Sequence, residues 1–533
     1  MERKQVISVV LNGHLPFVRR PEQPRSCEEQ WFFEALSETY LPLLEVMDRL
    51  EGDHVPFCLA LSLSPTLCHM MGDEILLRRY LEYTDRQIEF GRRELARTVA
   101  DEDMQRLARI YYDRQIERRI SFTERHEKNI LGAFDYYQRK GKIEILATAA
   151  THAFFPFIAS FPEAVNAQIE VAIGACRRHF GKYPQGFWLP ELGWTGEVEG
   201  YLRSFNFGYT IVNTHGIVFG EPAAKKGSFY PVKTPQGIFI IGRDYHAAEH
   251  MSRIVRAGVY RDNGRDAGHE LPVGLIDSFI NRSGGRTFTG YKYWNSGKNG
   301  RSPLYNFREA GEKAVTHARE FLEERSARLQ AAGKHIDGSP LSLCVFDADN
   351  LGRFWYEGPS FLESLFRMGR GYQDIQFMTP SEYLYKQDSG TFQMSTPGFS
   401  SAGVNGYAET WLDASNDWMY RHLSRAIDRM VELAERFPND SGLKERSLNQ
   451  AAREILLAQA SDWPRMLYQQ ESAEYARSQI EGSLRNFTTI YEALGSGYIS
   501  TEWLTSLERR HNIFPHINYR VFRRKHNGKS SGT

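Results

Sequence analysis

Cysteine is scarce in this chain of 533 residues, and its distribution excludes two common uses. The five cysteines are an odd number, lie far apart and form no Cys-x-x-Cys pair of the kind that binds zinc or carries out redox chemistry. We therefore expect reduced, buried thiols rather than a disulfide framework. The five are Cys27, Cys58, Cys68, Cys176 and Cys344.

Long hydrophobic runs are also missing. No stretch approaches the roughly 18 uninterrupted apolar residues that a membrane helix requires. The run Val6–Leu11 follows basic residues, but it is too short for a signal peptide and lacks a small-residue cleavage site. This run reads as a first buried strand, and we expect a cytoplasmic protein with no membrane partner.

An excess of charge of either sign is absent as well. Lys+Arg and Asp+Glu both total 66, so the formal net charge is zero. Such a chain has no general field that would attract polyanions, and nucleic acid is not expected as a partner. A glycine-rich phosphate loop is not found either, which argues against a nucleotide site in a doubly wound sheet.

What the chain does contain is a series of short apolar runs between longer, charge-rich helical stretches. Buried strands that alternate with helices indicate a parallel α/β fold, either a barrel or a doubly wound sheet. Polar residues come directly after several of these runs, and a barrel active site requires such residues at the carboxyl ends of its strands. The runs are Val6–Leu11, Phe57–Ser62, Ile143–Thr148, Gly186–Leu189, Tyr209–Val212, Ile238–Ile241 and Leu341–Phe346.

The first 405 residues divide into three predicted parts. Residues 1–199 form the first part of a catalytic barrel, with long helices inserted from about Asp73 to Gln138, where charged residues surround apolar ones at helical spacing. Residues 200–237 have a shorter, glycine-rich pattern that indicates a small inserted segment. Residues 238–405 complete the barrel.

The remaining residues show a different periodicity. Residues 406–526 are predicted to form a C-terminal helical domain, because apolar residues follow the 3.6-residue period and Asn416 is well placed as an N-cap. Further helical runs cover Asn449–Asp462 and Glu471–Leu494. Residues 527–533 read as a disordered tail.

Two acids follow predicted strands and are candidates for catalysis. Glu191 comes after Gly186–Leu189 with Trp188 beside it, and Asp347 comes after Leu341–Phe346, ahead of a second aromatic cluster. Retaining glycosidases require two carboxyl groups about 5–5.5 Å apart, a nucleophile and an acid/base. An acid at a strand end is more often a helix cap or a surface ion-pair partner, and only the pairing with tryptophan favours catalysis.

Two histidines, His14 and His152, also follow predicted strands. A single histidine is usually structural, but two in the same layer as the acids could contact sugar hydroxyls. A zinc site made by these histidines with Asp347 and Asp349 is the competing hypothesis. Neither His-x-x-x-His nor His-x-His spacing is present, so we expect no metal and no other cofactor.

Several motifs resemble those of glycoside hydrolase family 57, above all its α-1,4-glucan branching enzymes and related amylase-like members. They occur in order over nearly the whole chain. The motifs are His14-Leu-Pro-Phe-Val18, Ile143 through Thr151-His152, Trp188-Leu-Pro-Glu191, Asp347 through Gly358, Asn416 through Leu423 and Asn449 through Leu456.

The resemblance implies an α/β fold, an incomplete (β/α)7 barrel with a helical insertion, and a C-terminal all-helical domain that closes over the substrate groove. It implies that Glu191 is the nucleophile and Asp347 the acid/base. It also implies that His14 and His152 line the −1 sugar site. The other expected substrate-binding residues are Trp188, Trp294, Trp355, Trp411 and Asp462.

The chain departs from the family pattern at three places. After Asp347 the sequence reads Ala-Asp-Asn-Leu-Gly-Arg-Phe-Trp where Thr-Glu-Leu-Phe-Gly-His-Trp-Trp is common. Ala402 stands where the family usually has a tryptophan, which removes one aromatic platform. The segment Asp244–Gly268 replaces a long loop that carries a Gly-Tyr-Pro-Gly-like sequence in branching members.

The function that the resemblance implies is transfer of an α-1,4-glucan segment to a 6-hydroxyl by a 1,4-α-glucan branching enzyme, through a covalent glycosyl-enzyme. The expected partner is an α-1,4-glucan such as amylose or a glycogen-like polymer, and the oligomeric state stays open. The alternatives are an α-amylase or 4-α-glucanotransferase on the same scaffold, a glucan-binding pseudoenzyme, and a metal-dependent deacetylase.

Overall fold

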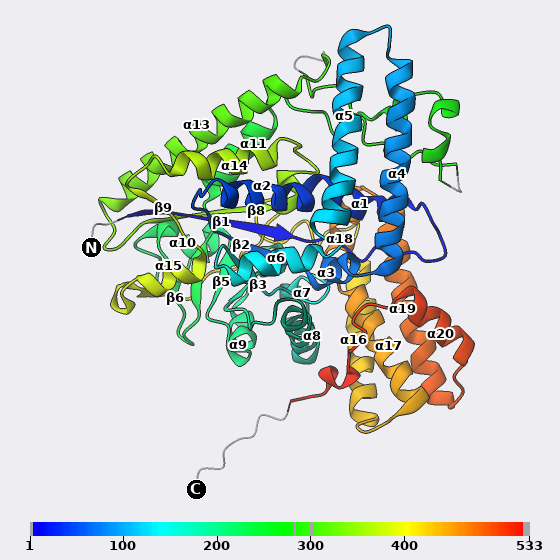
Figure 1. Ribbon diagram of the computed structural model, residues 1–533. Coiled ribbons are helices and arrows are strands. Elements are labelled where there is room, and N and C mark those ends of the chain that lie inside the picture. The colour runs from blue at the N-terminus through cyan, green and yellow to red at the C-terminus, as the bar shows by residue number, and fades with distance from the viewer. Residues whose placement is uncertain (1–3, 282–283, 298–301, 526–533) are drawn as a thin grey trace.

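The computed structural model describes residues 4–281, 284–297 and 302–525. Strands with helices packed around them form its larger part, and a bundle of C-terminal helices lies beside this part (Figure 1). The α/β class and the helical C-terminal region are therefore as predicted. The predicted tail, residues 527–533, lies outside the described residues.

Seven strands correspond to the seven predicted apolar runs. Residues Val6 to Gly13 of the first strand are all buried, which explains why its sequence is continuously apolar rather than alternating. The strands are β1 (Gln5–Gly13), β2 (Leu59–Leu63), β3 (Ile143–Leu146), β4 (Gly186–Phe187), β5 (Tyr209–Val212), β7 (Phe239–Gly242) and β8 (Leu341–Asp347).

These strands pair in parallel, so their carboxyl ends face the same way. β1 pairs with β2 on one side and with β8 on the other, and β2 pairs with β3. A single bridge from Ala147 to Phe187 connects the end of β3 to β4, and β4, β5 and β7 then pair in that order. Just past β7, the amide of Asp244 donates to the carbonyl of Leu343 in β8 at 2.8 Å.

Three short strands extend the sheets. β6 (Val232–Lys233) pairs antiparallel with β7, and β10 (Gln393–Met394) pairs with β6. β9 (Ile375–Phe377) pairs with the first residues of β1.

Helices surround the strands (Figure 1). They are α1 (Cys27–Ala35), α2 (Leu41–Gly52), α3 (Pro65–Met71), α6 (Ile130–Arg139), α7 (Phe155–Ile158), α8 (Pro162–Phe180), α9 (Gly196–Ser204), α10 (Thr214–Val218), α11 (Tyr245–Val255), α13 (Phe307–Gly333), α14 (Gly358–Gly369) and α15 (Pro380–Lys386). The short helix α12 (Ala267–Glu270) lies apart from them: the amide of Ala267 donates to the carbonyl of Tyr291, whose ring packs against Phe90 in the long helix Glu74–Arg97.

The predicted helical insertion is a long hairpin that projects from the rest of the molecule (Figure 1). It consists of α4 (Glu74–Arg97) and α5 (Glu102–Ile120). The carboxylates of Asp73 and Asp101 each accept a hydrogen bond from the first turn of the following helix, which explains where both helices begin.

The segment of residues 200–237, predicted from the sequence to be a small insertion, also includes a predicted strand at Tyr209–Val212. It contains β5, which lies between β4 and β7 in the parallel order. Residues Tyr209–Val212 therefore form a central strand of the parallel order, because an apolar run flanked by glycines in sequence can still be a central strand once its neighbours pair with it.

The C-terminal region consists of α16 (Trp418–Arg436), α17 (Gly442–Ala458), α18 (Asp462–Gln469), α19 (Ala473–Ser496) and α20 (Thr501–Arg510). The sequence pattern predicts Asn416 as the N-cap of α16. In the structure Asp417 takes that position. The buried amide of Asn416 instead donates to the carbonyls of Thr410 and Pro464 at 3.1 and 3.0 Å, which ties the start of α16 to α18.

The structure also bears on the state of the cysteines and on whether a helix could span a membrane. The five cysteines are free thiols; Cys68 and Cys344 are buried as predicted, whereas Cys27 is exposed. Within the described ranges, no helix combines the length and the apolar character needed to cross a membrane.

Candidate active site

The candidate residues lie at the carboxyl ends of the parallel strands. His14 follows β1, His152 follows β3, Glu191 follows β4 and Asp347 is the last residue of β8. β1 and β8 are in register at Asn12 and Asp347, and the amide of Asn12 donates to Oδ1 of Asp347 at 3.0 Å. The parallel sheet therefore brings together residues that are more than 300 positions apart in sequence.

Glu191 lies in a tight turn, Pro190–Leu192, with a left-handed backbone (φ 57°) that is uncommon for a residue other than glycine. The amide of Ala402 donates to the carbonyl of Glu191 at 2.6 Å and helps to hold this turn. The side chain is only 16% exposed. Its Oε1 accepts from the hydroxyl of Ser461 at 3.0 Å and lies 3.7 Å from Nδ1 of His152.

Burial has the largest effect on the pKa of Glu191. Removal from water raises the pKa of this carboxyl to about 7; the cation of Arg465 opposes the rise, and the nearby carboxylates of Asp347 and Asp462 add to it. The group is therefore close to the balance between its two protonation states at neutral pH.

Asp347 differs from Glu191 in its exposure. Its side chain is exposed at the edge of a cleft of about 330 Å³, which Glu191 and Asp347 both line. Asn12, Trp188, Arg243 and Ala402 are also in its wall. One largely buried and one exposed carboxyl group thus face a single cleft.

The two histidines stack on each other. Their ring centroids are 3.8 Å apart and the rings are 7° from parallel. Nε2 of His14 lies 2.8 Å from Oδ2 of Asp462, and Nδ1 lies 2.9 Å from the hydroxyl of Ser64. Nδ1 of His152 lies 3.0 Å from the hydroxyl of Ser461. Burial and the neighbouring His14 hold the pKa of His152 well below its ordinary value, so this ring is neutral.

Three side chains near the two histidines and Glu191 come from the C-terminal helical region: Ser461, Asp462 and Arg465. Asp462 is buried, which disfavours its charge, yet His14 and Arg465 together hold its pKa below the ordinary value. Nη2 of Arg465 donates to Oδ1 of Asp462 at 3.1 Å. Sequence reasoning named Asp462 but missed Ser461 and Arg465, whose only signal is that they lie one and three positions from it.

The predicted tryptophans are dispersed. Trp188 is in the cleft wall, 3% exposed. Trp355 is 1% exposed and packs against Tyr260 and Phe361, and Trp411, also 1% exposed, stacks on Phe154 with centroids 4.9 Å apart. The structure therefore places these last two within the protein core rather than in the cleft.

Trp294 lies in the segment that follows α12. Its indole nitrogen donates to Glu270 at 2.8 Å, and the guanidinium of Arg265 lies 4.4 Å from the ring centroid. It is not among the residues that line the cleft with Glu191 and Asp347.

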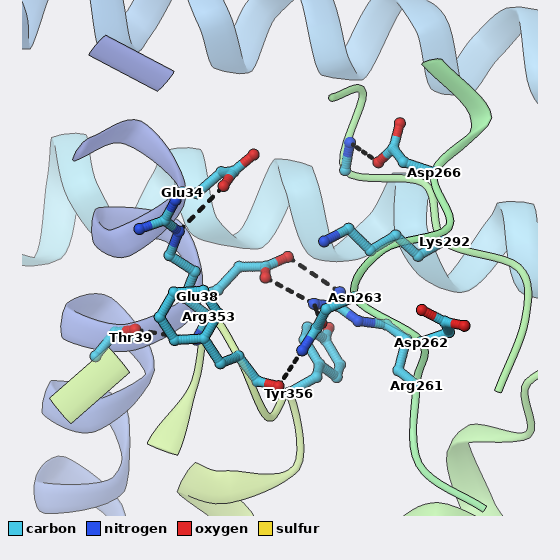
Figure 2. Close-up of polar contacts among 12 residues, drawn as sticks. Glu34, Glu38, Thr39, Arg261, Asp262, Asn263, Asp266, Lys292, Arg353 and Tyr356 are labelled. Carbon is cyan, nitrogen blue, oxygen red and sulfur yellow. Dashed lines mark hydrogen bonds and ion pairs between the residues drawn. The ribbon is translucent and has the colours of Figure 1, made fainter. Parts of the chain in front are cut away.

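Two of the altered residues after Asp347, Asp349 and Arg353, belong to a buried polar network, part of which Figure 2 shows around Arg353. Arg353 donates to Glu34 at 3.2 Å and pairs with Asp349 at 3.6 Å. Asp349 is thereby directed away from the cleft and is buried. These two departures from the family pattern are therefore paired inside the protein, whereas Asn350, a third, lines the cleft.

A second ion pair completes this network. Arg261 donates to both oxygens of Glu38, at 3.0 and 2.7 Å. Burial works against ionisation of Glu38, but the Arg261 guanidinium outweighs it and lowers the pKa to about 2. The pair connects the segment after α11 to the π-helical segment Leu36–Tyr40 between α1 and α2 (Figure 2).

The competing zinc hypothesis has no arranged ligand set among the residues that the structure describes. Both ring nitrogens of His14 already contact Ser64 and Asp462, and Asp349 pairs with Arg353. The four residues of that hypothesis therefore do not converge on one point.

Two families match this chain. Residues 8–252 match glycosyl hydrolase family 57, and residues 422–522 match the family described as 1,4-alpha-glucan branching enzyme, C-terminal. A curated 1,4-alpha-glucan branching enzyme of Thermococcus kodakarensis is 27% identical over 96% of this chain and 77% of its own length.

Two solved structures are similar to this chain over nearly its whole length. The alpha-amylase AmyC from Thermotoga maritima is 33% identical with a TM-score of 0.91, and the match covers 98% of this chain and 99% of that one. A GH57-type branching enzyme from Pyrococcus horikoshii is 25% identical with a TM-score of 0.88, over 98% and 97% of the two chains. The resemblance seen in the sequence motifs is confirmed: the chain belongs to glycoside hydrolase family 57.

Proposed function

We propose that this chain is a retaining enzyme that acts on α-1,4-glucans, and specifically a 1,4-α-glucan branching enzyme. The observation that carries the proposal is the pairing of a largely buried Glu191 with an exposed Asp347 in one cleft. The names of the relatives from Thermococcus kodakarensis and Pyrococcus horikoshii support the same activity.

In the proposed reaction Glu191 is the nucleophile. Its ionised carboxylate attacks the anomeric carbon, while protonated Asp347 gives its proton to the oxygen of the leaving glucan. A covalent glycosyl-enzyme forms. A carboxylate held in a site from which water is largely excluded is poorly solvated, and this favours its attack.

In the second step Asp347 acts as the base. It removes a proton from the incoming hydroxyl, which attacks the anomeric carbon and releases Glu191. A 6-hydroxyl of another glucan gives an α-1,6 branch, whereas water gives hydrolysis. Exposure of Asp347 to the cleft allows either acceptor to reach it.

The proposed scaffold is an incomplete (β/α)7 barrel. The parallel order β1, β2, β3, β4, β5, β7 and β8 returns to β1, and this supports a ring of strands. The junctions from β3 to β4 and from β7 to β8 have a single bridge and a single hydrogen bond, respectively, which supports incomplete closure.

The substrate-binding roles of the remaining residues belong to the same proposal. His14, His152, Trp188 and Asp462 surround the two carboxyl groups or the cleft. Trp294, Trp355 and Trp411 stay predictions, and the two buried ones require a rearrangement before they can contact a glucan. A cytoplasmic location is also proposed, and the free state of all five cysteines supports it.

An α-amylase is the second candidate. Ala402 lines the cleft beside Glu191, so position 402 itself offers no aromatic side chain to hold an acceptor glucan against competition from water. The 33% identical relative from Thermotoga maritima is named an alpha-amylase. We therefore propose a branching enzyme with an appreciable hydrolytic share.

Incubation of the full chain with amylose tests both candidates. A branching enzyme produces α-1,6 linkages in excess of new reducing ends, and an amylase produces mainly reducing ends. Glu191→Gln should remove both products, whereas Glu197→Gln, which changes an exposed acid in the nearby α9, should retain them. Amylose binding by the wild type without either product would instead support a glucan-binding pseudoenzyme.

A further inference from the structure

The nucleophile carboxylate has two oxygens in different surroundings. Oε1 of Glu191 accepts from Ser461 at 3.0 Å and lies 3.7 Å from Nδ1 of His152. For Oε2, the described residues provide no hydrogen-bond partner. The two oxygens are therefore not equivalent in the folded protein.

Ser461 connects the two strand-end residues through one hydroxyl. That hydroxyl has a single proton, and an ionised Glu191 can only accept it. The Ser461 oxygen must then accept from His152, so the ring carries its proton on Nδ1. The hydrogen bonds run in one direction, from His152 through Ser461 to Glu191.

A separate observation supports this tautomer of His152. Its Nε2 is buried and, within the described chain, has no hydrogen-bond partner. A proton on Nε2 would be a buried donor without an acceptor, which is costly, so the neutral ring places its proton on Nδ1. His14, stacked flat on this ring at 3.8 Å, holds its orientation.

The backbone places Ser461 independently of its side chain. Its amide donates to the carbonyl of His152 at 3.1 Å, and Ala460 forms an antiparallel bridge with Ala153. The residue is 1% exposed. Removing the hydroxyl therefore leaves the contact between the helical region and the strand-end loop in place.

From this geometry, and resting on the proposed function, we infer that Ser461 is a positioning residue for the nucleophile. The Ser461 hydroxyl donates its proton to Oε1 of Glu191, and the bond from His152 to the Ser461 oxygen fixes the orientation of that hydroxyl. Oε2 is therefore the oxygen that attacks the anomeric carbon. A chain of two aligned hydrogen bonds also stabilises the ionised carboxylate against the effect of burial.

Other charged groups face Glu191 and must stay unchanged in a test. Arg465 favours its ionised form, and Asp347 and Asp462 disfavour it. The titratable and charged groups around the cleft and the histidine pair are His14, His152, Arg243, Arg256, Asp347, Asp462 and Arg465. Substitution of uncharged Ser461 alters none of these charges directly.

The test compares Ser461→Ala, Ser461→Thr and the control Ser478→Ala in the full chain. Ser478 is an exposed serine of α19 that donates only within its own helix, so its loss should change nothing. Loss of a hydrogen bond to a charged group should lower kcat about 10- to 100-fold in Ser461→Ala. KM should change less than about threefold, because the attack rather than binding is affected.

The pH profile of kcat/KM on amylose separates positioning from a merely structural role. Without the Ser461 proton, the pKa of Glu191 rises, so the acidic limb of the profile should move to higher pH in Ser461→Ala. Ser461→Thr, which keeps the hydroxyl, should restore the wild-type limb and most of kcat. An equal loss in both variants with an unmoved limb overturns the inference.

A measurement that does not depend on turnover distinguishes this inference from the proposed function. Nitrogen-15 NMR of His152 should show a neutral ring with its proton on Nδ1, and carbon-13 titration of the Glu191 carboxyl should shift upward in Ser461→Ala. If the wild type is inactive on amylose but both signals behave in this way, the proposed function fails and the positioning role stands. A proton on Nε2 refutes the role whatever the activity.

Discussion

Replacement of Glu191 by glutamine is expected to abolish turnover and, at alkaline pH, to stabilise the fold. Burial raises the pKa of this carboxyl from 4.5 to about 7. The difference corresponds to about 3 kcal/mol, at about 1.4 kcal/mol for each tenfold change in proton affinity. The folded protein thus binds this proton more tightly than the unfolded chain does.

The sign of the pH dependence follows from this comparison. The contribution of Glu191 to stability is fully present below pH 4.5, the ordinary pKa of the group, and is lost as the pH rises through about 7. Glutamine does not ionise, so Glu191→Gln avoids this loss. Its free energy of unfolding should exceed that of the wild type by about 3 kcal/mol at pH 8 and by about 1 kcal/mol at pH 5.

Chemical denaturation at the two pH values measures the stability difference, and amylose turnover measures the activity. Glu197→Gln, which neutralises an exposed acid nearby, should show neither effect. Loss of a covalent nucleophile costs several orders of magnitude, so retention of more than about a hundredth of the wild-type rate would refute the assignment. A stability gain that is the same at pH 5 and pH 8 would refute the electrostatic reasoning.

Three further outcomes are expected. Asp347→Asn should reduce amylose turnover far more than Asp349→Asn, because Asp349 is buried against Arg353 rather than exposed to the cleft; the reverse order would contradict the acid/base assignment. Prolonged EDTA treatment should leave the rate unchanged, since two carboxyl groups suffice for the chemistry, whereas full loss with recovery on zinc addition would favour a metal site. Ala402→Trp should raise the ratio of α-1,6 linkages to reducing ends, because the added indole can stack on the acceptor glucan, a contact worth about 0.5–1.5 kcal/mol. An unchanged ratio would show that an aromatic side chain at position 402 does not govern the choice of acceptor.

The strand ends were accessible to sequence reasoning because their signals are local. A continuous apolar run followed directly by a polar residue marks a buried strand and its carboxyl end, and this rule located His14, His152, Glu191 and Asp347. Parallel pairing then brought these residues to one end of the sheet. The α/β class with a helical C-terminal region could be predicted for the same reason.

The surroundings of these residues could not be predicted in the same way. Trp355 and Trp411 lie in motifs that suggested sugar platforms, yet each is covered by aromatic neighbours distant in sequence. Ser461 and Arg465 approach Glu191 only through the docking of α18, about 270 positions later in the chain. A local pattern contains no information about which face of a helix will meet a strand end.

The hydrogen bond between His14 and Asp462 joins residues separated by 448 positions. At translation rates of about 5–20 residues per second, the ribosome needs about 20–90 s to add Asp462 after His14 has been synthesised. During that interval the nascent chain contains Glu191 and, later, Asp347, but lacks the helix that holds the nucleophile. Glucan chemistry should therefore begin only after synthesis has passed α18, so that onset of activity reports synthesis of this helix rather than formation of the sheet.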